Sequence, residues 1–125
     1  MPHNAAMPAF LPTVVETSAF TRRAEKLLSD EEYDDLIYYL ARYREAGDEI
    51  PGTGGVRKLR FAAFGRGKSG GVRAVYYFYD EDTPLYAIFL YGKNEQTDLT
   101  SEQKKEAKAF AAIIKKAAMN KRSAQ

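Results

Sequence analysis

Basic side chains concentrate in residues 51–79, which contain six Lys or Arg residues and no Asp or Glu. These cations are Arg57, Lys58, Arg60, Arg66, Lys68 and Arg73. Lys and Arg neutralise phosphate charge, and the glycines of residues 65–71 let a backbone approach a phosphodiester closely. This stretch therefore predicts binding to a phosphate group.

A group of cations can also cleave RNA. The 2′-hydroxyl is a built-in nucleophile, so catalysis mainly requires stabilising the charge on the phosphorane and the leaving oxygen. A lysine crowded by other cations can have a lowered pKa and act as a base near neutral pH. We predict that the catalytic residues are Lys58, Arg60, Lys68, Arg73 and Lys93. The predicted RNA-binding residues are Arg57, Arg66 and Tyr91, the tyrosine by stacking on a base.

Two of these residues also have a structural alternative. Arg57 could instead pair with an acidic side chain of a neighbouring helix, and Arg73 with a buried carboxylate. Four other tyrosines are expected to be core or half-buried strand residues rather than base-stacking ones: Tyr76, Tyr77, Tyr79 and Tyr86.

The sequence lacks the residues that other catalytic chemistries need. There is no cysteine, and the one histidine, His3, lies in a proline-rich lead, so we expect neither a histidine-based triad nor a metal site. The stretch 65–70 lacks the glycine spacing of a nucleotide-binding loop, and a strand follows it. The acidic residues gather near 30–35, where their spacing fits a solvated helix face. We expect no metal and no cofactor.

Length and composition fit one domain. The chain has 125 residues, of which 45% are hydrophobic and 13% aromatic, enough for a single core. We expect a disordered or non-native lead at residues 1–12, one domain at 13–119 and a polar tail at 120–125. With no cysteine, no apolar run of membrane-spanning length and no signal-peptide pattern, the chain is expected to be cytoplasmic and to have no membrane partner.

Periodicity places the cations on a small sheet. Residues 13–16 predict a strand, a helix begins near Ser18, and a capping box at Ser29 predicts a second helix that reaches Gly47. Strands are expected at 56–62, 72–79 and 85–91, and a last helix after Thr100.

The predicted order is therefore βααβββα, an α+β fold in which two N-terminal helices and a C-terminal helix pack on a small antiparallel sheet. On the first basic strand Lys58 and Arg60 should face one side and Arg57 the other.

Three blocks of this sequence, in this order, resemble the HigB branch of the RelE/ParE superfamily of toxins. They are Gly52–Arg60, Gly65–Tyr77, and Tyr91–Glu95 with Asp98–Thr100; Ser29–Tyr33 also fits, and the resemblance covers about residues 13–116. It implies a RelE-like fold and a toxin of a type II toxin–antitoxin system. By its motifs, the resemblance implies catalytic residues at Lys58 and Arg60 on the first basic strand, Arg73 at the Gly-x-Arg position and Lys93 after the last strand.

The resemblance also implies a function and partners. Toxins of this branch bind the ribosomal A site, next to the 16S rRNA of the small subunit, and cut the mRNA there. Each is silenced by a cognate antitoxin, often one with a helix-turn-helix domain. The family's usual C-terminal tyrosine is absent here after Tyr91. Two alternatives stay open because fold does not fix function: a ParE-like gyrase inhibitor and a non-catalytic module that binds RNA or an antitoxin.

Overall fold

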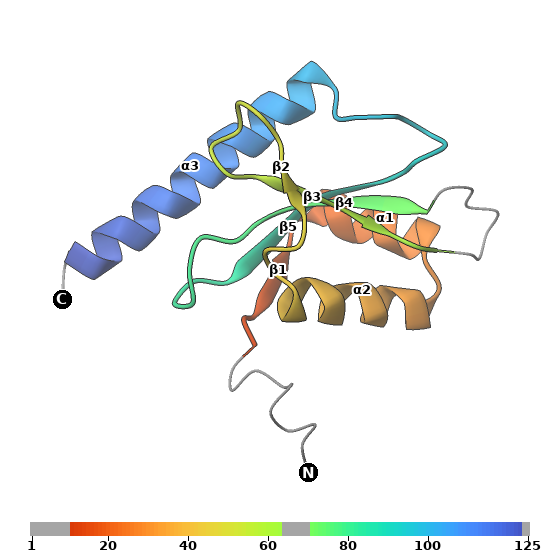
Figure 1. Cartoon of the computed structure of the whole chain (residues 1–125), viewed down its shortest axis with the longest axis horizontal. Helices are drawn as coiled ribbons and strands as arrows, with labels where there is room; N and C mark the ends of the chain where they lie inside the picture. The colour runs from red at the N-terminus through yellow and green to blue at the C-terminus, as the bar shows by residue number, and fades with distance from the viewer. Residues whose placement is uncertain (1–10, 64–70, 124–125) are drawn as a thin grey trace, which may run out of the picture.

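The computed structural model describes residues 11–63 and 71–123. Within them, three helices pack on a five-stranded sheet (Figure 1). The elements in chain order are β1 (Val14–Glu16), α1 (Ser18–Leu27), α2 (Asp30–Arg42), β2 (Asp48–Glu49), β3 (Arg57–Phe61), β4 (Val72–Tyr77), β5 (Leu85–Gly92) and α3 (Ser101–Ser123).

Side-chain caps fix where the helices begin. The Thr17 side chain accepts the backbone N–H of Phe20 at the start of α1. Ser29 and Glu32 form the predicted capping box at α2, and Thr100 and Gln103 exchange equivalent bonds ahead of α3. Because such bonds satisfy backbone donors that a helix leaves free, they confirm the predicted helix starts.

The predicted end of the second helix is wrong. The second helix ends at Arg42 rather than at Gly47, because the chain must turn back toward the sheet. The Gly47 N–H is donated to the buried Tyr76 hydroxyl at 2.9 Å, and a side chain at Gly47 would come within 2.9 Å of that oxygen. The last helix continues through the predicted polar tail to Ser123, where Arg122 pairs with Asp80.

The sheet has the order β1-β5-β4-β3-β2. The predicted α+β class and the helix and strand order are confirmed, with two differences in detail. The first strand pairs in parallel with β5, so the sheet is mixed, and the two-residue strand β2 was not predicted. Strands β4 and β5 lie in the centre of the sheet, since each has neighbours on both sides.

Each face of the sheet has its own core. Helices α1 and α2 cover one face, and α3 crosses the other (Figure 1). The α1/α2 core contains Phe20, Leu36 and Leu59, and the α3 core contains Val56, Val75 and Ala111. Alternation along β3 therefore places Lys58 and Arg60 on the same face as Val56, the α3 face, as predicted.

Candidate nucleic-acid interface

Three of the predicted site residues form a row across the sheet. In the strand register Arg60 pairs with Arg73, and Arg73 pairs with Tyr91. Residues that are paired in the strand register share a face of the sheet, so all three lie on the α3 face. They lie beside the start of β4. Like charges placed directly opposite one another destabilise a sheet. An anion bound to Arg60 and Arg73 would therefore stabilise this part of the sheet.

Lys58 lies two residues before Arg60 on the same face. Its Nζ is 3.3 Å from Oδ1 of Asp98, in the segment between β5 and α3. The Leu99 N–H donates to the same oxygen at 2.8 Å; this bond and the Lys58 ammonium hold the pKa of Asp98 below its usual range. Lys58 therefore has an anionic neighbour, Asp98, in addition to the nearby cations.

Sequence reasoning missed Asp98 as a neighbour of the site. The residue lies 40 positions after Lys58, and nothing in the local sequence indicates that the two meet. Its contact arises only because the β5–α3 segment returns over the α3 face of the sheet (Figure 1).

Lys93 lies beside the entry of β4. Its backbone N–H donates to the Gly71 carbonyl at 3.1 Å, which places the turn after β5 next to the row. We call Lys58, Arg60, Arg73 and Lys93 the cationic end of the sheet. These four of the five predicted catalytic residues are brought to one end of the molecule, and Lys68, the fifth, lies outside the described residues, as does Arg66.

Gly71 shapes this end of the sheet. Its φ is +75°, and a Cβ there would lie 2.4 Å from the Phe61 carbonyl oxygen. In the Gly71→Ala variant, backbone strain and steric overlap should together lower the free energy of unfolding by about 2–4 kcal/mol. The melting temperature should fall by roughly 10 °C.

Gly52 provides the matched control for that prediction, because it has φ +79° but nothing within 4 Å of the position that a Cβ would occupy. In thermal melts, Gly52→Ala should therefore lower the free energy of unfolding by only about 1 kcal/mol. Equal losses in the two variants would mean that the close approach to Phe61 does not matter.

Tyr91 completes the row but is only 3% exposed. Burial raises the pKa of its phenol, as does the Asp98 charge, while the Arg73 charge lowers it. The hydroxyl has no hydrogen-bond partner in the part of the chain that the structure describes. Base stacking by Tyr91 would require the ring to leave the core, whereas Tyr76 and Tyr77 are core residues as predicted.

Arg57 is not brought to the cationic end. It faces the opposite side of β3, where its guanidinium donates to the Gly47 carbonyl at 2.6 Å and to the Glu45 carbonyl at 3.1 Å. Glu49 lies 3.6 Å away. These contacts hold the segment before β3, and the acidic partner belongs to strand β2 rather than to a neighbouring helix.

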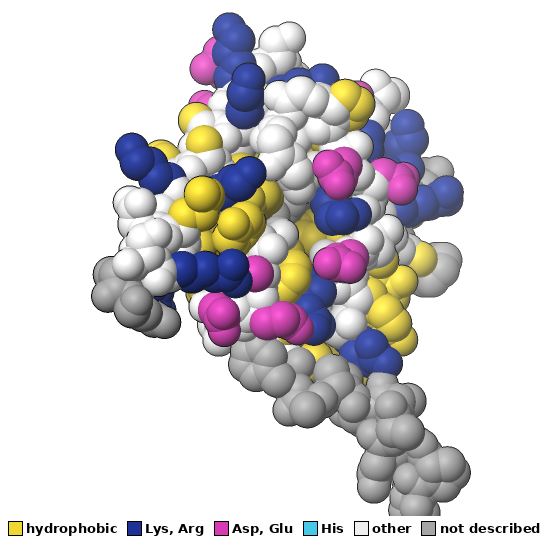
Figure 2. Space-filling model, turned by 60° about the vertical axis from the view of Figure 1, so that its left-hand side comes forward, with side chains coloured by type: hydrophobic (Ala, Val, Ile, Leu, Met, Phe, Trp, Pro, Cys, Tyr) yellow, Lys and Arg dark blue, Asp and Glu magenta, His cyan; other side chains and the backbone are white. Residues whose placement is uncertain are grey.

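The opposite end of the molecule has mixed charge. Figure 2 brings forward the end that carries the C terminus, and acidic side chains lie among the basic ones there. Arg122 pairs with Asp80 and Asp82, and Arg44 pairs with Glu81. Since these cations have their own carboxylates, this end offers less to a polyanion than the cationic end.

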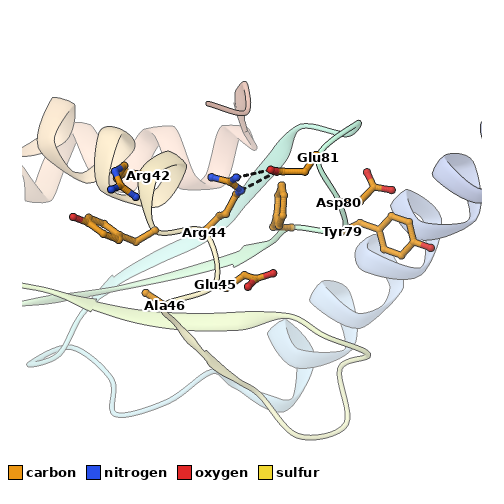
Figure 3. Close-up of a pocket in the computed structure, with 9 residues that line it drawn as sticks. Arg42, Arg44, Glu45, Ala46, Tyr79, Asp80 and Glu81 are labelled. Carbon is orange, nitrogen blue, oxygen red and sulfur yellow. Dashed lines mark hydrogen bonds and ion pairs between the residues drawn. The ribbon is translucent and has the colours of Figure 1, made fainter. Parts of the chain in front are cut away.

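A pocket of about 750 Å³ lies at this mixed end, between the end of α2 and the segment after β4 (Figure 3). Arg44 reaches across it to hold both carboxylate oxygens of Glu81, and its guanidinium lies 5.4 Å from the Phe78 ring centre. The arginine is thus committed to holding α2 against the hairpin, and we assign this pocket no part in phosphate chemistry.

Comparison with known proteins identifies the family. A family model described as "RelE toxin of RelE / RelB toxin-antitoxin system" matches residues 13–124. This chain therefore belongs to the RelE toxin family. The match is to the family as a whole, so the HigB branch stays a prediction.

One solved structure supports the fold. An arginine-to-alanine double mutant of the E. coli toxin RelE in the free state superposes with a TM-score of 0.52 at 18% identity, covering 78% of this chain and 95% of that one. The intact E. coli RelBE toxin–antitoxin complex gives a TM-score of 0.48 at 18% identity, covering 65% of this chain and 95% of that one.

Among the described residues, none of the helices has the length and apolar character that a membrane span requires.

Proposed function

We propose that this toxin is a cytoplasmic, ribosome-dependent mRNA interferase that cuts mRNA in the A site and is neutralised by a cognate antitoxin, one with a helix-turn-helix domain. The observation that carries the proposal is the row in which Arg60 faces Arg73 beside Lys58 and Lys93. Two guanidiniums held on rigid strands can bind phosphate oxygens with two N–H groups each.

The proposed reaction needs no metal. The RNA 2′-hydroxyl gives up its proton and attacks the adjacent phosphorus, the bond to the 5′-oxygen breaks, and that leaving oxygen takes up a proton. The products are a 2′,3′-cyclic phosphate and a 5′-hydroxyl end. Arg60 and Arg73 stabilise the extra negative charge of the phosphorane, where it is larger than in the substrate. Lys58 and Lys93 neutralise neighbouring phosphates, and the ribosome, through the 16S rRNA, holds the mRNA in the reactive geometry.

Induced expression of the chain should stop growth by halting translation. Primer extension on mRNA from induced cells should show cuts inside coding regions, and only where ribosomes are loaded. A transcript whose start codon has been removed serves as the control and should stay intact. Intact transcripts together with trapped gyrase–DNA complexes would replace this proposal with a ParE-like one; binding without cleavage would indicate a non-catalytic module.

A further inference from the structure

The row of Arg60, Arg73 and Tyr91 ends at a pocket. In the sheet order β5 lies between β4 and β1, but β1 pairs only with Leu85–Ala87, so within the described residues no strand lies beside Tyr91 on that side. A pocket of about 400 Å³ lies there, and it is lined by α1, the end of β5 with Tyr91, the turn that follows and the start of α3. Paired residues on neighbouring strands lie about 5 Å apart, so a phosphate held by Arg73 would lie close to this pocket. The nucleotide attached to that phosphate can therefore reach it.

Two glutamines that line the pocket are held in one orientation by their hydrogen bonds. The Thr100 N–H donates to Gln103 Oε1 at 3.0 Å, and because a backbone N–H can only donate, the atom that faces it must be the amide oxygen. Gln96 Nε2 donates to the Asp98 carbonyl at 2.8 Å and to Gln103 Oε1 at 3.1 Å, which uses both of its hydrogens. Obligatory partners therefore fix which end of each amide is oxygen and which is nitrogen.

Each of these amides keeps one group available for a ligand. Among the described residues, Gln96 Oε1 and Gln103 Nε2 have no hydrogen-bond partner, and the first is an acceptor and the second a donor. The pair adjoins the cationic end, because Asp98, whose carbonyl binds Gln96, has its carboxylate 3.3 Å from the Lys58 ammonium. An acceptor and a donor thus lie next to the place where RNA phosphate would bind.

A nucleobase has the complementary pair of groups. Adenine and cytosine each present an amino group, which donates, beside a ring nitrogen, which accepts, and glutamine amides pair with such edges. Uracil has a carbonyl and a ring N–H in these two places. The half-buried Phe89 and the exposed Arg22 also line the pocket, and a ring and a guanidinium plane are surfaces on which a base can stack. Glu95 lines it too, with its carboxylate paired to Arg23.

We propose that this pocket binds one base of the mRNA, in a nucleotide that adjoins the cleaved phosphate, and that Gln96 and Gln103 select adenine or cytosine over uracil there. This inference rests on the proposed function. Gln96 Oε1 accepts a hydrogen bond from the amino group of the base, and Gln103 Nε2 donates one to its ring nitrogen. The two glutamines contact the substrate away from the reacting atoms, so they determine which mRNA is cut.

Cleavage on mRNA-programmed ribosomes should depend on the base beside the cut. With adenine, cytosine or uracil placed in turn on each side of the cut phosphate, kcat/KM of the parent chain should be about tenfold higher for adenine and cytosine than for uracil at one of the two positions. Equal values for the three bases at both positions would overturn the proposal. An inactive parent chain would overturn the proposed function together with this inference, whereas an active parent without base preference would overturn this inference alone.

The Gln103→Glu variant replaces the donor by an acceptor. One carboxylate oxygen still accepts from Thr100 and Gln96, so the helix cap and the melting temperature should be kept. The other oxygen should repel the ring nitrogen of adenine and accept the ring N–H of uracil, so the ratio of kcat/KM for adenine to that for uracil should fall by about tenfold. A general loss of activity cancels in this ratio, and an unchanged ratio would contradict the proposal.

Asn94→Asp is the matched control. Asn94 is exposed in the turn after β5 and does not line the pocket, so its variant adds the same negative charge near the cationic end without changing the amide pair. It should lower cleavage of all the mRNAs alike and keep the parental ratio. If the ratio falls as much in Asn94→Asp as in Gln103→Glu, added charge explains both changes, and the proposal is wrong.

Discussion

Replacement of Arg73 by alanine is expected to lower the single-turnover rate of mRNA cleavage by about 10² to 10³, or roughly 3–4 kcal/mol. Arg73 lies between Arg60 and Tyr91 in the strand register and directly follows the short Gly71–Val72 entry to a central strand. A rigid strand holds the half-buried side chain, so its donors are in place before negative charge builds on the phosphate. The loss should therefore appear in the rate more than in ribosome affinity.

Two comparisons make the Arg73 test specific. Arg73→Lys should keep only part of the activity, because an ammonium cannot reproduce the two-pronged geometry of a guanidinium. Melting curves of the same preparations separate a catalytic from a structural role. An alanine variant that melts early, yet cuts at the parental rate once cooled to where it is folded, would remove Arg73 from the site.

Local signals predicted most of the fold. Ser29 with Glu32, and Thr100 with Gln103, are short-range patterns whose hydrogen bonds form within one turn, so they could be recognised without any tertiary information. The second helix nevertheless ends at Arg42, because a contact between Gly47 and Tyr76, 29 residues apart, competes with its continuation. Strand β2 has only two residues and depends on pairing with β3, and it carries no periodicity of its own.

The candidate site was predictable in composition but not in arrangement. Alternation along one strand put Lys58 and Arg60 on one face and separated them from Arg57, as the structure has them. The facing of Arg60 and Arg73 depends on the register of two strands, which the sequence between them does not reveal. The approach of Asp98 to Lys58 depends on how the β5–α3 segment folds back, and no local pattern encodes that path.

Binding of single-stranded RNA to this toxin should depend steeply on salt. Each phosphate contact releases counterions and contributes about −0.7 to the slope of log affinity against log salt concentration. Contacts from the four residues of the cationic end predict a slope of roughly −3, so affinity should fall about 60-fold between 50 and 200 mM salt. Fluorescence anisotropy with a short RNA, at constant magnesium, measures this slope directly.

The Arg60→Ala variant tests whether the cationic end supplies those contacts. Arg60 is exposed at the end of the row and takes part in no ion pair among the described residues, so its loss should leave the fold intact and reduce the slope by about 0.7. Lys108→Ala, on the exposed face of α3, removes the same charge away from the row and should leave the slope unchanged. Equal changes in the two variants would indicate that RNA responds to net charge alone, and a flat salt response of the parent chain would mean that these cations serve folding or antitoxin contact instead.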